Sequence, residues 1–175
     1  QLLSAPQVEE RAQELKSRLD SYMQRRGLKT NDVQVFAKEK GVELVLDHQL
    51  LFEPGSASLS PEGEALMLQV ADLLKDLRQV RFDLFDYSSS IANPVTALPG
   101  LPLAALRAAG IYRFLVLRGG WPAGAVRAFG RIAAPASENA VASSQEYLLL
   151  KVSGGIPYYG VDGKEGKIKV GDFTF

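Results

Sequence analysis

The chain has 175 residues, 46% of them hydrophobic, and its 20 basic and 20 acidic residues cancel. This size allows one substantial core, and the balanced charge gives no reason to expect a nucleic-acid partner. The absence of cysteine excludes a disulfide scaffold and thiol catalysis, and a single histidine, His48, excludes a multi-histidine metal site within one copy. We therefore predict neither a metal nor another cofactor.

Residues 5 to 27 are predicted to form a first helix, with Pro6 in its first turn and Gly27 at its end. Apolar residues repeat at spacings of four and three, which is typical of an a/d seam. The seam consists of Val8, Ala12, Leu15, Leu19 and Tyr22. Two interpretations stay open: a helix packed on its own domain, or a short parallel coiled coil between two copies.

A hairpin and a second helix come next. Apolar residues alternate over 33–37 and again over 42–46, around a polar turn, which predicts a β-hairpin with one buried face. Ser60 is placed to cap a helix that begins at Pro61. The apolar stripe of that helix consists of Leu66, Val70, Leu73, Leu74 and Leu77.

The second half of the chain continues to alternate strands and helices. Residues 80–85 predict a strand, 91–102 a proline-rich loop, and Leu103 onward a helix that ends at Gly119 and Gly120. Shorter strands are predicted at 126–129 and 147–152, with a loop over 133–144 between them. Trp121 is expected to cap the core beneath the preceding helix. This order predicts an α/β sandwich with helices on one face of a mixed sheet.

Several segments, taken in order, resemble the OmpA-like domain family. Leu50-Leu51-Phe52 with Gly55-Ser56-Ala57 resembles the family's strand end and loop, and residues 60–63 resemble the helix cap that follows. The segment from Leu103 through Arg107 to Gly120 resembles its arginine-bearing helix and glycine stop. Within the family, the resemblance is to the periplasmic domain of MotB, the peptidoglycan-anchored subunit of the flagellar stator.

The resemblance implies an α+β sandwich in three parts: residues 1–30 as a linker helix or dimer coil, 31–153 as the OmpA/MotB-like domain, and 154–175 as a tail or hairpin. It also implies a non-enzymatic periplasmic domain that anchors or positions an ion-driven stator at the peptidoglycan. In the full-length protein, a MotA-like membrane subunit and a second copy of the chain would be partners. We expect the chain to begin inside a longer inner-membrane protein, with the anchor before Gln1.

The alternative function is an OmpA-like interaction module of a secretion or envelope-assembly complex that does not bind peptidoglycan. An enzyme is not predicted, because no nucleophile and base are placed together. His48 next to Asp47 has no serine in a strained turn beside it, so we interpret it as an ordinary loop histidine.

The family's ligand site pairs a strand-end aspartate with an arginine on the next helix, because a zwitterionic diamino acid needs one anion and one bidentate cation. Arg107 falls at the arginine's place. Where a Gly-His-Thr-Asp motif is usual, this chain has Leu84-Phe85-Asp86-Tyr87, so Tyr87 takes the aspartate position. The candidate peptidoglycan-binding residues are Arg107, Asp86, Tyr87 and Ser88.

Asp86 lies one residue too early in this alignment, and we expect it to reach Arg107 only if a β-bulge turns it round. The alternative is that Arg107 pairs locally on its helix and that the ligand site is degenerate. In both interpretations, the backbone conformation at the end of this strand decides whether the ligand site is intact.

Overall fold

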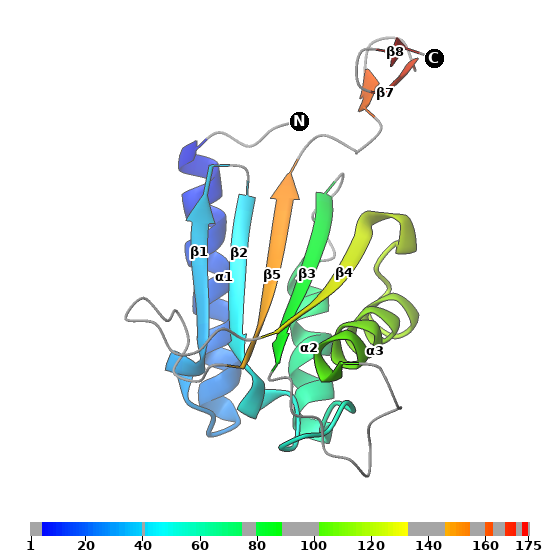
Figure 1. The fold of residues 1–175 in the computed structure, drawn as a ribbon. Helices are drawn as coiled ribbons and strands as arrows, with labels where there is room; N and C mark the ends of the chain where they lie inside the picture. Colours follow the sequence, from blue (N-terminus) through cyan, green and yellow to red (C-terminus); the bar gives the residue numbers. More distant parts are fainter. Residues whose placement is uncertain are drawn as a thin grey trace.

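The computed structural model describes residues 5–39, 41–74, 80–88, 102–132, 146–154, 160–162, 167–170 and 173–174. Within these residues, one five-stranded sheet carries three α-helices (Figure 1). The helices are α1 (Ala5–Arg25), α2 (Pro61–Leu74) and α3 (Leu103–Leu117). The strands of the sheet are β1 (Val33–Lys38), β2 (Gly41–Asp47), β3 (Val80–Ser88), β4 (Val126–Ile132) and β5 (Tyr147–Gly154). Short 3₁₀ turns are η1 (Thr30–Asp32), η2 (His48–Leu50) and η3 (Ala123–Ala125).

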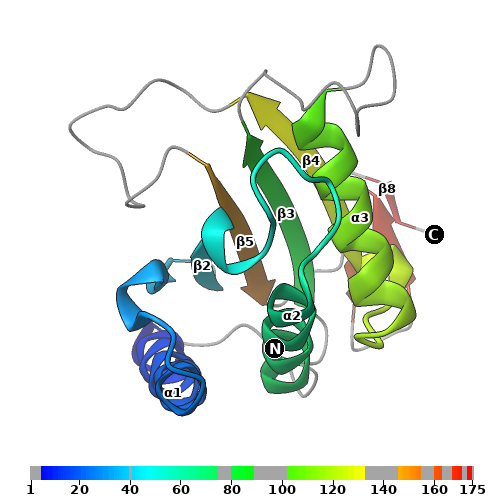
Figure 2. The same cartoon turned by 90° about the horizontal axis from the view of Figure 1, so that it is seen from below.

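The sheet is mixed, with the strand order β1-β2-β5-β3-β4. Strands β3 and β4 are parallel and are joined through α3, whereas the other neighbouring pairs are antiparallel. All three helices lie on one side of the sheet, and no helix of the described residues covers the other side (Figure 2). The predicted sandwich of helices on one face of a mixed sheet is confirmed.

Beyond β5, three short strands form a separate antiparallel sheet in the order β6-β7-β8. They are β6 (Gly160–Asp162), β7 (Lys167–Val170) and β8 (Phe173–Thr174). The sequence predicts a tail or hairpin here, and the described residues add a third strand to a hairpin.

Helix α1 buries its apolar seam in the core of its own chain. Every seam residue from Val8 to Tyr22 is buried, and the helix lies along β1 and β2. The structure therefore agrees with the first of the two interpretations, in which the N-terminal helix packs on its own domain. Gly27 follows the helix with a φ of 66°, a left-handed conformation that glycine adopts without strain.

The start of α2 fixes the segment that follows β2. The hydroxyl of Ser60 accepts a hydrogen bond from the backbone N–H of Gly63 at 3.0 Å, which confirms the predicted cap. A Cβ on Gly63 would lie 2.4 Å from the carbonyl oxygen of Leu51, so the helix and this segment are in direct backbone contact. The stripe is buried at Leu66, Val70 and Leu74, while Leu77 lies outside the described residues.

Trp121 stacks on Phe82 of β3 with ring centroids 3.9 Å apart, and both rings are buried. The indole covers the core where the chain leaves α3, which confirms the predicted cap. The predicted loops at 91–102 and 133–144 lie outside the described residues, apart from Pro102, which directly precedes α3.

The helix-free face of the sheet carries a charged cluster around Asp83. Its carboxylate accepts hydrogen bonds from Arg127 at 2.8 and 3.1 Å, and Arg81 lies 3.4 Å away. Partial burial raises the pKa of Asp83, but the hydrogen bonds and positive charges of Arg127 and Arg81 together outweigh it and hold the pKa below its usual value.

We predict that Leu19→Ala lowers the free energy of unfolding by about 2–5 kcal/mol, because Leu19 is fully buried between α1 and the sheet. Leu117→Ala is the matched control: its side chain is 74% exposed, and the expected change is below about 0.5 kcal/mol. Urea unfolding at two protein concentrations measures both. A concentration-dependent loss for Leu19→Ala would indicate that the seam binds a second copy instead.

A lowered pKa means that ionised Asp83 stabilises the fold at pH values above the ordinary aspartate range, and that this contribution is lost as the pH falls through the lowered pKa. We therefore expect Asp83→Asn to reduce stability at neutral pH and to lose the difference from the native chain in acid. Thermal melts from pH 7 down to pH 2 measure it. An equal destabilisation at every pH would contradict the assignment.

Candidate functional site

The predicted site lies at the end of the sheet where β3 ends, α3 begins and η2 follows β2. Strand β3 alternates buried and half-buried side chains, so Phe82 and Leu84 face the helices. The same alternation turns Asp86 and Ser88 toward α3. Two of the candidate residues are therefore brought to the helix face by the apolar pattern that precedes them.

The expected bulge is absent from β3. Each residue from Val80 to Tyr87 pairs with one residue of β5, and the pairing with β4 continues to Ser88. The prediction that a bulge is needed to turn Asp86 inward is wrong, because burying Phe82 and Leu84 already sets Asp86 on the inner face. Asp86 is connected to Arg107 through Ser88 and His48. Tyr87 lies on the opposite face, where it stacks on Tyr147 at 4.6 Å, and it is not brought to Arg107.

Arg107 is the centre of the site and is only 1% exposed. Its Nε donates to the backbone oxygen of Ser56 at 2.7 Å, and its Nη1 donates to the hydroxyl of Ser88 at 3.0 Å. Glu146 lies 3.5 Å from Nη1, and the guanidinium lies over the ring of Phe52 at 4.6 Å. These partners come from distant segments, so Arg107 does not pair locally on its own helix.

Asp86 has no exposed surface, and its two oxygens meet different partners. Oδ1 accepts a hydrogen bond from the Ser88 hydroxyl at 2.6 Å. Oδ2 lies 2.8 Å from Nε2 of His48, but the two atoms do not have the geometry of a hydrogen bond. One oxygen of a fully buried carboxylate thus lies against the imidazole without a well-aligned donor.

His48 lies between Asp86 and Arg107, and it is 4% exposed. Its Nδ1 is 3.0 Å from Nη1 of Arg107, and because a guanidinium can only donate, Nδ1 must be the acceptor. The ring proton is then on Nε2, facing Asp86. The interpretation of His48 as an ordinary loop histidine is wrong, because η2 turns the imidazole inward between the two charged groups.

The sequence-based prediction missed four contributors: His48, Ser56, Phe52 and Glu146. Ser56 acts through its backbone oxygen, which no residue pattern reveals, and Glu146 stands after a predicted loop far along the chain. His48 carried the one available signal, since it directly follows the last buried residue of a strand. Chain order gave no indication that the end of β2 meets the end of β3 around α3.

A cavity of about 500 Å³ opens beside the imidazole and the guanidinium. Its lining includes His48 and Arg107, and acidic side chains surround them. The acidic lining residues are Asp47, Glu53, Glu62 and Glu146. Arg107 and His48 therefore adjoin open space, whereas Asp86 lies behind the ring.

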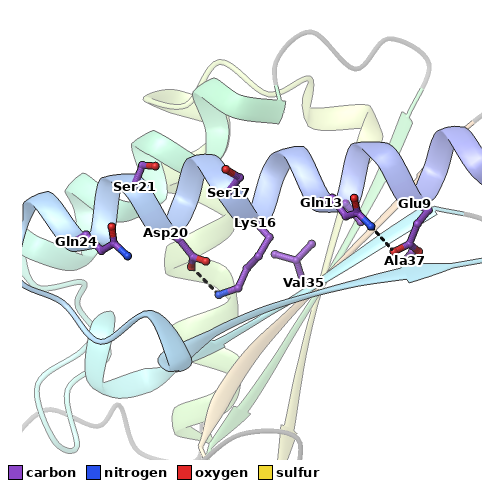
Figure 3. Close-up of a pocket in the computed structure, with 10 residues that line it drawn as sticks. Glu9, Gln13, Lys16, Ser17, Asp20, Ser21, Gln24, Val35 and Ala37 are labelled. Atoms are coloured by element: carbon purple, nitrogen blue, oxygen red, sulfur yellow. Dashed lines mark hydrogen bonds and ion pairs between the residues drawn. The ribbon is translucent and has the colours of Figure 1, made fainter.

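A second hollow, of about 490 Å³, lies between α1 and β1 (Figure 3). Lys16, at its centre, donates to Asp20 at 2.7 Å and to the backbone oxygens of Thr30 and Val33 at 3.0 and 2.7 Å. These bonds connect α1 to the edge of the sheet. The ammonium group of Lys16 therefore stabilises the fold.

The described residues bring no three His, Asp or Glu side chains together in an arrangement that would hold a metal ion. No helix among them has both the length and the apolar character that crossing a bilayer requires.

We predict that Ser88→Ala destabilises the chain by about 1–3 kcal/mol, because the hydroxyl bridges the buried carboxylate of Asp86 and the guanidinium of Arg107. Ser153→Ala is the matched control on β5, since its hydroxyl makes only a 3.5 Å contact with the oxygen of Arg81. Chemical unfolding measures both variants. Equal small effects would show that the bridge contributes little.

No family model matches the sequence, and no curated protein sequence gives a significant match. Solved structures do match. A MotB-like protein from Desulfovibrio vulgaris is similar over 85% of this chain and 98% of its own, with 15% identity and a TM-score of 0.64. The cell wall anchor of the T6SS from Pseudomonas aeruginosa is similar over 79% and 96%, with 21% identity and a TM-score of 0.60.

The periplasmic domain of Helicobacter pylori MotB (residues 90–256) is similar over 69% of this chain and 78% of its own, with 16% identity and a TM-score of 0.55. At such low identities the likeness is one of fold. The chain has an OmpA-like fold similar to that of MotB periplasmic domains, as the sequence resemblance predicts.

Proposed function

We propose that this chain is a non-enzymatic, periplasmic OmpA-like domain that anchors or positions an ion-driven, flagellar-type stator at the peptidoglycan. Arg107, Asp86 and Ser88 are the proposed binding residues, and Tyr87 is left out because it lies on the far face of the sheet. The observation that carries the proposal is a buried arginine that borders a cavity at the start of α3 and is connected through Ser88 and His48 to the buried carboxylate of Asp86.

The fold supports this role, since two of the similar structures are a MotB-like protein and a MotB periplasmic domain. The chemistry also fits: the guanidinium of Arg107 borders the cavity and offers a positive charge to a carboxylate of a wall peptide. A MotA-like membrane subunit and a second copy of the chain complete the proposed assembly. We also propose that the membrane anchor is a segment of the longer, full-length protein.

A second function has its own support. The fold is also similar to that of a T6SS cell wall anchor, which favours a place in a secretion or envelope-assembly complex. The full burial of Asp86 favours an interaction module that does not depend on peptidoglycan, because its carboxylate is not accessible to a ligand.

Co-sedimentation with purified peptidoglycan sacculi tests the proposal. We expect the native chain to sediment with sacculi and Arg107→Gln to lose most of that binding, because glutamine keeps a polar side chain but removes the charge that attracts a carboxylate. Arg131→Gln is the matched control, since Arg131 is an exposed arginine on the helix-free face. Thermal melts confirm that each variant is folded.

Two results would contradict the anchoring function. If the native chain does not sediment with sacculi at any protein concentration, the second function is favoured. If Arg107→Gln and Arg131→Gln both retain native binding, the wall contact lies elsewhere on the surface.

A further inference from the structure

The neighbours of His48 are unusual for a buried imidazole. Its Nε2 lies 2.8 Å from the carboxylate of Asp86, and its Nδ1 lies 3.0 Å from the guanidinium of Arg107. One imidazole ring thus separates the carboxylate of Asp86 from the guanidinium of Arg107 and approaches each with one nitrogen. A small zwitterion, with an ammonium group at one end and a carboxylate at the other, has the complementary arrangement over a similarly short span.

We propose that His48 is a built-in substitute for a zwitterionic ligand, so that the pair of Asp86 and Arg107 accepts the head group of an amino acid only when the imidazole moves out. The inference rests on the proposed function, in that it concerns the same pair of charged residues. It adds a residue that decides whether the pair is open or closed.

The fit of the ring is incomplete on the Asp86 side. Both Nε2 of His48 and Oδ2 of Asp86 are buried without a well-aligned hydrogen bond. A buried carboxylate oxygen in this state gains from any donor that reaches it with better geometry. An ammonium group offers three freely rotating donors and a full charge, so it satisfies Oδ2 better than the fixed ring nitrogen does.

The ring also has somewhere to go. His48 belongs to η2 and lines the cavity of about 500 Å³, and its ring makes an edge-to-face contact with Phe52 at 5.1 Å. Rotation of the side chain into this cavity needs no change in the sheet. Arg107 stays in place during such a movement, because Ser56 and Ser88 continue to hold it.

Removal of the ring tests the proposal. We expect His48→Gly to leave a polar hole between Asp86 and Arg107 that binds free imidazole, which raises the Tm of the variant by about 4 °C or more, with saturation. The native chain should show no such rise. Gln49→Gly is the matched control, because it loosens the same turn at an exposed position and removes no buried ring.

Glycine is the second probe, since it carries both charged groups and is slightly smaller than the side chain removed. We expect glycine to raise the Tm of His48→Gly, whereas N-acetylglycine, which lacks the ammonium group, and glycinamide, which lacks the carboxylate, do so at least tenfold more weakly. The double variant His48→Gly/Arg107→Gln should lose the response to glycine. If imidazole and glycine shift His48→Gly no more than Gln49→Gly, the proposal is overturned.

A measurement on the native chain keeps the proposal testable even if His48→Gly does not fold. The chain has one histidine, so ¹⁵N NMR reports this ring without overlap. We expect the proton on Nε2 and an unprotonated Nδ1. A proton on Nδ1 would remove the acceptor that faces Arg107 and would overturn the proposal.

The outcome is separate from that of the wall-binding function. If His48→Gly binds glycine but no variant sediments with sacculi, the built-in ligand stands and the anchoring function fails. If native sedimentation depends on Arg107 while His48→Gly binds neither imidazole nor glycine, the anchoring function stands and His48 is only a structural residue.

Discussion

A guanidinium that is almost completely buried has to be neutralised and hydrogen-bonded where it lies. In this chain that requirement determines how η2, the end of β3 and the start of α3 pack together. Arg107 is carried by α3, yet its partners are the loop oxygen of Ser56, the strand hydroxyl of Ser88 and the imidazole of His48. These groups come from the segment before α2, from the end of β3 and from η2. A displacement of β2, β3 or α3 relative to one another would cost the buried charge at least one of these partners.

The glycines near the site serve the same end by allowing backbones to approach. A Cβ on Gly130 would lie 2.5 Å from the backbone nitrogen of Ala105, so the first turn of α3 rests directly on β4. Gly63 allows the equivalent contact between α2 and the residue after η2. The two contacts fix the backbone positions from which Arg107 and His48 extend. They explain how η2, β3 and α3, which are far apart in the sequence, stay within hydrogen-bonding distance of one another around Arg107.

The sequence predicted the scaffold well, because its elements depend on local patterns: alternation in β1 to β3, a serine cap before α2 and a period of three to four in α1. It identified Arg107 as a candidate from the order of the segments along the chain.

Prediction from the sequence failed for side chains whose contacts depend on how helices and strands pack against one another. Asp86 was assigned to the wrong face because alignment to a motif was preferred over the burial of Phe82 and Leu84. His48 was missed because its partners lie 38 and 59 positions away. Contacts of this kind are set by the packing of α3 against the sheet, which no pattern along the chain encodes.

The placement of the start of α1 and the end of β5 relative to the cavity has a mechanical consequence. The first turn of α1 and the last residues of β5 lie at one end of the sheet, and the cavity with η2 and the end of β3 lies at the other (Figure 1). A pulling force applied between these two ends runs along the strands. Hydrogen bonds between strands are perpendicular to that direction, so the load is divided over many of them at once and they shear together instead of opening one after another. The same sheet pulled across its strands would separate at a much lower force. A sheet loaded along its strands in this way therefore resists tension through many of its hydrogen bonds at once.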